Sequence, residues 1–165
     1  MAFRIAWFKV NHPLAFYAAY FYRRSQKGGF DAVLMTQGLD AVMANIKAID
    51  GDEKATDKDQ DLLITLEVVY EFYLRGLEFL PIDIYKSHAT KFLIEDGKIR
   101  PPFVAISGLG ENAAWDLMNG REGKEFLSME EVSIACPKVS KTHMQMLKEA
   151  GAFGSMPETN QVSLF

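Results

Sequence analysis

The segment of residues 101–121 constrains the fold of this chain more than any other. It contains Gly108 and Gly110 on either side of one apolar residue, and the residues that follow have the apolar spacing of a helix. Because glycine has no Cβ, these two positions allow a turn with positive φ and a close approach of the backbone to a bulky group. The sequence therefore predicts a hairpin that leads into a helix beginning near Asn112.

Such a hairpin has the right chemistry to hold a phosphate oxygen. The unpaired N–H groups at the helix start, the glycine amides before it and the positive end of the helix dipole all favour an anion there. This is how helix-hairpin-helix motifs contact the DNA backbone. Glu111 argues against a phosphate here, because a carboxylate in the first helical turn competes for the same amides. The alternative is that the hairpin is only a tight turn in a helical protein. The candidate DNA-binding residues are Ser107, Gly108, Leu109, Gly110 and Asn112.

A second helix, link and helix follow the first set. Ser128 with Glu131 three residues later is a capping box and predicts a helix that ends at Cys136. Ser140 then predicts the start of another helix, which ends at Gly151. The repetition predicts a tandem helix-hairpin-helix unit, and the second link, which lacks paired glycines, is interpreted as a degenerate copy. Its candidate phosphate contacts are Lys138, Ser140 and Lys141.

The last residues form a polar, proline-containing segment that closes on two large apolar side chains. These side chains cannot be buried in a helix of their own, so they are either a loose tail or an anchor for a pocket in another molecule. The end resembles the Gln-x-x-Leu-Phe peptide by which bacterial polymerases bind the sliding clamp, with the valine in place of the usual leucine weakening the contact. The candidate clamp-binding residues are Gln161, Val162, Ser163, Leu164 and Phe165.

Two helices are predicted near the N-terminus, over residues 3–10 and 13–22, because Pro13 excludes the preceding residue from the helical conformation. The second helix is apolar on nearly every side, so we expect it to be buried within this chain or against protein outside it. Three basic residues near its end could contact a phosphate, but residues of this kind at a helix C-terminus more often lie in solvent and offset the dipole. They are Arg23, Arg24 and Lys27.

Residues 30–49 and 57–75 each show the apolar period of a helix, and Gly76 is a C-terminal stop for the second. We expect two long helices that pack as a hairpin. The acidic link between them lacks the glycine and glutamate spacing of a calcium loop, so we interpret it as a solvated linker.

Asp96 and Gly97 join residues 92–95 to residues 98–100, which is a strong signal for a two-residue β-hairpin. With the helices above, this predicts a mainly α fold with a small β-hairpin. We expect a helical connector domain, then the tandem helix-hairpin-helix unit, then an extended C-terminal tail.

Several classes of function are excluded by the composition. His12, His88 and His143 lie far apart, and the chain has no Walker loop, serine elbow or Rossmann fingerprint, so no catalytic residue, metal or cofactor is expected. The single Cys136 suits a reducing cytoplasm, and no apolar run approaches the roughly twenty residues that span a bilayer. We expect a cytoplasmic protein that contacts no membrane.

The net charge of −4 is unusual for a protein that binds duplex DNA. Residues 98–151, which contain the predicted hairpins, hold seven basic and seven acidic side chains. Affinity for DNA grows with the number of phosphates that a protein neutralises. Any binding of DNA by this region alone is therefore expected to be weak.

The whole chain resembles the C-terminal portion of the PolC-type DNA polymerase III α subunit of low-GC Gram-positive bacteria. Five separated motifs occur in the order of that family. They are residues 2–21, residues 76–87 with 89–92, residues 99–110, residues 139–142 and the terminal pentapeptide.

The resemblance implies four segments and three partners. Residues 1–27 would end the fingers, residues 28–100 would form a helical hairpin and β connector, residues 101–153 would bind duplex DNA without sequence preference, and residues 154–165 would dock on the clamp. The partners would be duplex DNA, the sliding clamp (the β subunit) and the rest of the polymerase chain. A chain of 165 residues is too short to hold the family's palm domain as well, so it should not polymerise DNA by itself. A free-standing helical interaction protein with purely structural hairpins is the alternative.

Overall fold

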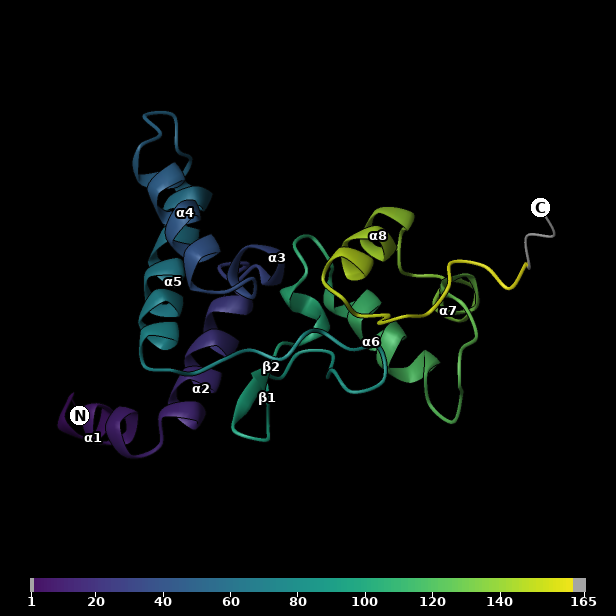
Figure 1. The fold of residues 1–165 in the computed structure, drawn as a ribbon, viewed down its shortest axis with the longest axis horizontal. Helices are drawn as coiled ribbons and strands as arrows, with labels where there is room; N and C mark the ends of the chain where they lie inside the picture. Colours follow the sequence, from purple (N-terminus) through teal and green to yellow (C-terminus); the bar gives the residue numbers. More distant parts are fainter. Residues whose placement is uncertain (1, 162–165) are drawn as a thin grey trace.

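The computed structural model describes residues 2–161. Figure 1 shows α1, α2, α4 and α5 at one end of an elongated molecule and α6 to α8 at the other, with the β1–β2 hairpin between them. The predicted fold class, mainly α with a small β-hairpin, is confirmed.

The first two helices are α1 (Ala2–Asn11) and α2 (Pro13–Ser25). His12 separates them with a φ of −133° and a ψ of 60°, and Pro13 occupies the first turn of α2. The predicted break is confirmed at this position, since the residue before a proline avoids the helical region. α2 continues to Ser25, which is beyond the predicted end at residue 22.

The single helix predicted over residues 30–49 is wrong. The structure has a short α3 (Ala32–Met35) and a separate α4 (Leu39–Asp50). An Asp31 side-chain oxygen accepts the Val33 amide at 2.9 Å and starts α3, and Gly38 takes a φ of +102° that no helix allows. The apolar period continues across the break, so periodicity alone did not reveal it.

α5 (Asp57–Leu74) begins at a reciprocal capping box, in which the Thr56 hydroxyl accepts the Asp59 amide while the Asp59 carboxylate accepts the Thr56 amide. It ends before Gly76, which has a φ of +77°. α4 and α5 lie side by side as the predicted helical hairpin (Figure 1).

Strands β1 (Leu93–Glu95) and β2 (Lys98–Arg100) pair in antiparallel register, with Ile94 opposite Ile99. The turn residues Asp96 and Gly97 both have positive φ, 51° and 75°, as a tight hairpin of this hand requires. The Asp96-Gly97 signal therefore predicted this hairpin correctly.

The C-terminal part contains the 3-10 turn η1 (Phe103–Ala105) and three helices: α6 (Glu111–Gly120), α7 (Met129–Ala135) and α8 (Lys141–Glu149). The hydroxyls of Ser128 and Ser140 cap α7 and α8, as predicted. The capping box at Ser128 is only half formed, because the Glu131 carboxylate accepts the amide of Leu127 instead of that of Ser128.

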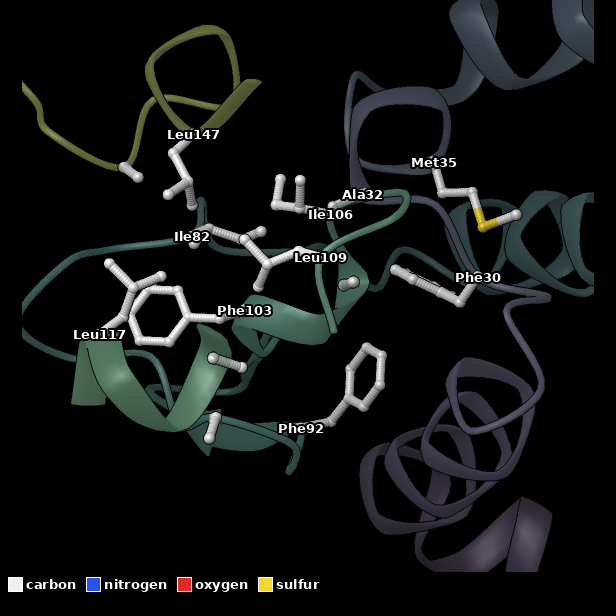
Figure 2. Close-up of a cluster of buried hydrophobic side chains, with 14 of the residues drawn as sticks. Phe30, Ala32, Met35, Ile82, Phe92, Phe103, Ile106, Leu109, Leu117 and Leu147 are labelled. Carbon is white, nitrogen blue, oxygen red and sulfur yellow. The ribbon is translucent and has the colours of Figure 1, made fainter. Parts of the chain in front are cut away.

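One hydrophobic core runs from α2 to α8. At one end Phe21, Phe30 and Phe92 pack with ring centroids 5.0 to 6.0 Å apart, which joins α2 to the β-hairpin. In Figure 2, the side chains of Ile106 and Leu109 lie in the middle of this core. Phe30 and Phe92 lie on one side of them, and Leu117 and Leu147 lie on the other. The segment that carries the predicted hairpin is therefore fixed in the centre of the core.

Candidate nucleic-acid interface

The candidate hairpin, residues 107–110, is held in place by its own Leu109 and by Ile106 just before it. Ile106 is fully buried and Leu109 is 4% exposed, while Gly108 and Gly110 both face solvent. The Leu109 amide donates to the Ile106 carbonyl at 3.1 Å and closes the turn. Core packing thus fixes the hairpin and presents its two glycines outward.

The two glycines have different backbone conformations. Gly108 has a φ of +79°, in the left-handed region that favours glycine, and it makes the turn. Gly110 has a φ of −72° and a ψ of 162°, which any residue adopts, and it is the N-cap of α6. Of the two glycines, only Gly108 thus uses positive φ for the turn, and at Gly110 the missing side chain leaves the helix start open.

The amides around this turn are free in the part of the chain that the structure describes. No acceptor is recorded there for the N–H groups of Gly108 and Gly110, and Gly110 supplies no side-chain cap. The first backbone bond of α6 runs from the Ala114 amide to the Gly110 carbonyl at 3.0 Å, so the N–H groups of Glu111 and Asn112 are also left over. Glu111 and Asn112 are both exposed, and an anion could reach this cluster of amides from solvent.

A cavity of about 550 Å³ lies beside the hairpin. One wall is made by residues 106–111, and the other by the end of α2, the loop after it and Lys58 of α5. Asp31, Glu111 and Lys58 all line this cavity, so it has two acidic residues and one basic residue at its edge. Burial raises the pKa of Asp31 above its usual value, while the amides that it caps act in the opposite direction. The cavity itself is therefore not a strongly cationic site.

The second hairpin is already partly satisfied by the protein. The backbone N–H of Lys138 donates to the Asp116 carboxylate of α6 at 2.9 Å, in the place where a phosphate oxygen would be expected. The Ser140 hydroxyl accepts the His143 amide at 3.2 Å. Lys138, Ser140 and Lys141 are exposed, so the two lysine side chains are what this hairpin presents to solvent. Sequence reasoning missed Asp116, because no pattern connects it to a link more than twenty residues away.

Sequence reasoning also missed the close contact between α6 and α7. A Cβ on Gly120 would lie 2.6 Å from the Cys136 Sγ and 3.2 Å from the Ala135 carbonyl oxygen. The glycine lets the two helices approach closely at this point. Burial raises the pKa of the Cys136 thiol to about 11, which agrees with a packing role for this residue.

The basic residues at the end of α2 do not act together. The Arg24 guanidinium forms an ion pair with Asp61 at 2.6 Å and donates to the Thr65 hydroxyl at 2.8 Å, which joins α2 to α5. Arg23 and Lys27 are exposed. Arg24 is thus a structural residue, whereas the other two remain open to solvent.

The start of the C-terminal tail is attached to the N-terminus of α7. The Met129 and Glu130 amides donate to the carbonyls of Pro157 and Glu158, at 2.9 and 3.0 Å. The Asn160 side chain donates to the Glu131 carboxylate at 2.6 Å, and Lys148 of α8 pairs with Glu158. Gln161 is exposed. The other candidate clamp-binding residues, Val162, Ser163, Leu164 and Phe165, lie outside the described residues.

Within residues 2–161, no helix combines the length and apolar character needed to cross a bilayer. The same part of the chain contains no group of three or more His, Cys, Asp or Glu side chains that could hold a metal ion.

Residues 76–162 match the helix-hairpin-helix motif family. This match covers more than half of the chain and includes both candidate hairpins, so the chain belongs to that family. Over its whole length the chain is also 46% identical to the PolC-type DNA polymerase III of Streptococcus thermophilus, 44% identical to that of Thermotoga petrophila and 42% identical to that of Thermotoga maritima. The resemblance seen in the sequence is thereby confirmed, and the chain is similar to a portion of these proteins.

The chain spans only 11 or 12% of the length of these relatives. What the whole relatives do therefore does not transfer directly to this portion.

Proposed function

We propose that this chain is a module of a bacterial replicative DNA polymerase that holds the duplex backbone without reading its sequence and ties the polymerase to the sliding clamp. The observation that carries the proposal is the open cluster of exposed amides at Gly108, Gly110 and the start of α6. Amides at a helix start bind phosphate oxygens, which every base pair offers alike. Residues 101–153 form the DNA-binding unit in this proposal, and Lys138 and Lys141 add positive charge.

The binding that we propose is weak in isolation. Residues 98–151 carry as many acidic as basic side chains, and Glu111 lies in the first turn of α6. Few phosphates are neutralised, so the affinity falls only gently with salt. The module therefore acts with other DNA contacts of the polymerase, and the nucleotidyl transfer takes place outside this chain, in the cytoplasm.

A titration with labelled duplex DNA tests the first half of the proposal. We expect the chain to bind mixed-sequence duplexes with equal affinity, with each phosphate-contacting lysine adding about 0.9 to the slope of log affinity against log salt. Replacing Lys138 and Lys141 by alanine should reduce the slope, while the matched variant Lys47→Ala, on the exposed side of α4, should not. Strict sequence preference, or no duplex binding at any salt concentration, would contradict the proposal.

The second half of the proposal concerns residues 154–165, which form the clamp-docking tail. Its start is attached to α7 through Pro157, Glu158 and Asn160, and this attachment brings the exposed Gln161 to the surface. A glutamine at a rim followed by two large apolar side chains suits a pocket on a partner. A pull-down with the bacterial sliding clamp should succeed with residues 1–165 and fail with residues 1–160. Equal recovery of the clamp by both would refute this role.

The N-terminal helix supports a contact with the rest of the polymerase chain. Phe3 is 83% exposed, Val10 is 70% exposed and Trp7 is 52% exposed. α1 therefore exposes apolar side chains to water, which is unfavourable unless another protein surface covers them. In our proposal, residues 1–27 end the fingers and residues 28–100 form the connector, and the absent part of the polymerase covers α1. Lengthening the chain at its N-terminus with the preceding polymerase residues should therefore reduce the binding of a hydrophobic dye.

A further inference from the structure

The two hairpins meet at His143. This residue lies in the first turn of α8, three positions after the Ser140 cap, and is half-buried. Its Nε2 atom lies 3.5 Å from the point where a Cβ on Gly108 would be. A ring nitrogen from α8 is thus placed against the backbone of the first hairpin at Gly108.

Ser140 fixes the other ring nitrogen. Its Oγ accepts the backbone N–H of His143 at 3.2 Å and lies 2.9 Å from the His143 Nδ1 atom. We infer that the Ser140 hydroxyl donates its one hydrogen to Nδ1 while it accepts the backbone N–H. A neutral imidazole whose Nδ1 accepts a hydrogen bond carries its own hydrogen on Nε2.

We propose that His143 is a further DNA-contacting residue, whose Nε2–H joins the Gly108 and Gly110 amides in holding one phosphate oxygen. This inference rests on the proposed function of the first hairpin and adds a residue that no sequence pattern indicated. It gives the second hairpin a role despite its occupied Lys138 amide. The phosphate site is then composite, and the relative position of the hairpins determines its affinity.

The arrangement also explains why a serine suits position 140. The Ser140 hydroxyl caps α8 and at the same time orients the imidazole, so one side chain sets both the helix start and the direction of the Nε2–H. An alanine there would remove the cap and leave Nδ1 without its partner. His143 acts on the ligand directly in this proposal, whereas the Ser140 hydroxyl acts through His143.

The test is a fluorescence anisotropy titration of the full chain with a mixed-sequence duplex. His143→Ala should weaken binding about tenfold, because a hydrogen bond to a charged group is lost. His143→Gln, which can place a side-chain N–H in a similar position, should recover part of the affinity. Gln145→Ala, an exposed position on the same helix, is the matched control and should bind as the unchanged chain does. Thermal unfolding of each variant shows whether α8 stays intact.

The two proposals fail in different ways. If His143→Ala binds as tightly as Gln145→Ala does, the inference is overturned, although duplex binding by the unchanged chain would still support the proposed function. If the unchanged chain binds no duplex, the proposed function falls and takes the inference with it.

Discussion

Gly110 is the position at which helix stability and DNA binding can be separated. Its φ and ψ of −72° and 162° are close to the −71° and 160° of Ser140, which caps α8 with its side chain. A Cβ on Gly110 would have no other heavy atom within 4 Å. An aspartate there can therefore adopt the N-cap conformation without strain, and its carboxylate would accept the free amides of α6.

The Gly110→Asp substitution should stabilise the protein. Exchanging a glycine N-cap for an aspartate yields a few tenths of a kcal/mol, and placing a negative charge at the start of a helix adds about 0.3–1 kcal/mol. Repulsion from the neighbouring Glu111 offsets part of this gain. We expect an increase of about 0.5 kcal/mol in the free energy of unfolding, measured by urea denaturation.

The same substitution should weaken DNA binding. The carboxylate would occupy the amides proposed for the phosphate, and two unit charges about 4 Å apart repel by about 1 kcal/mol in bulk water and about 4 kcal/mol near a protein surface. The affinity for a duplex should therefore fall by at least about tenfold. Gly110→Asn is the matched control, because asparagine caps the helix without the charge.

The result that would refute this reasoning is a Gly110→Asp protein that is more stable than the unchanged chain and still binds duplex DNA as tightly as it does. The amides of α6 would then be capped internally without loss of binding, and they could not be the phosphate site. A protein that loses both stability and binding would show instead that the N-cap geometry read from Gly110 is wrong.

Three other predictions concern packing, ionisation and the tail. Gly120→Ala should lower the free energy of unfolding, measured in urea, by about 1–3 kcal/mol, because the new Cβ meets the Cys136 Sγ at 2.6 Å. An unchanged urea midpoint would show that α6 and α7 can separate freely. Burial raises the pKa of Tyr73 to about 12. The stability that its neutral hydroxyl contributes is therefore present below pH 10 and is lost as the pH rises towards 12. The free energy of unfolding in urea should fall over this range, and the fall should be smaller in Tyr73→Phe. Val162→Leu should strengthen binding to the sliding clamp in surface plasmon resonance, and weaker binding would argue against the proposed peptide.

Local signals in the sequence identified most of the elements correctly. Ser128 and Ser140 cap helices, as serine does where an open backbone amide follows at the right spacing. Asp96-Gly97 forms the β-hairpin turn because both residues accept positive φ. The exposed turn at Gly108 was also predictable, since apolar neighbours were bound to be buried. These features depend on a few adjacent residues, so a linear sequence contains them.

Apolar periodicity was less informative where the chain bends. The residues around the break between α3 and α4 keep a helical period, yet Gly38 turns the chain and Asp31 starts a new helix. Periodicity reports which side chains are buried, and a bent segment buries the same side chains as a straight one. The sequence therefore predicted the burial here but not the path of the backbone.

The sequence by itself determined where α5, α7 and α8 begin, where the β-hairpin turns and that a glycine hairpin precedes α6. Only the tertiary structure decided which amides stay free, because Asp116 reaches the Lys138 amide from another helix while the amides of Gly108 and Gly110 have no acceptor in the described part of the chain. It also decided that His143 lies against Gly108. Hydrogen bonds between distant residues depend on the packing of whole helices, which no local pattern specifies.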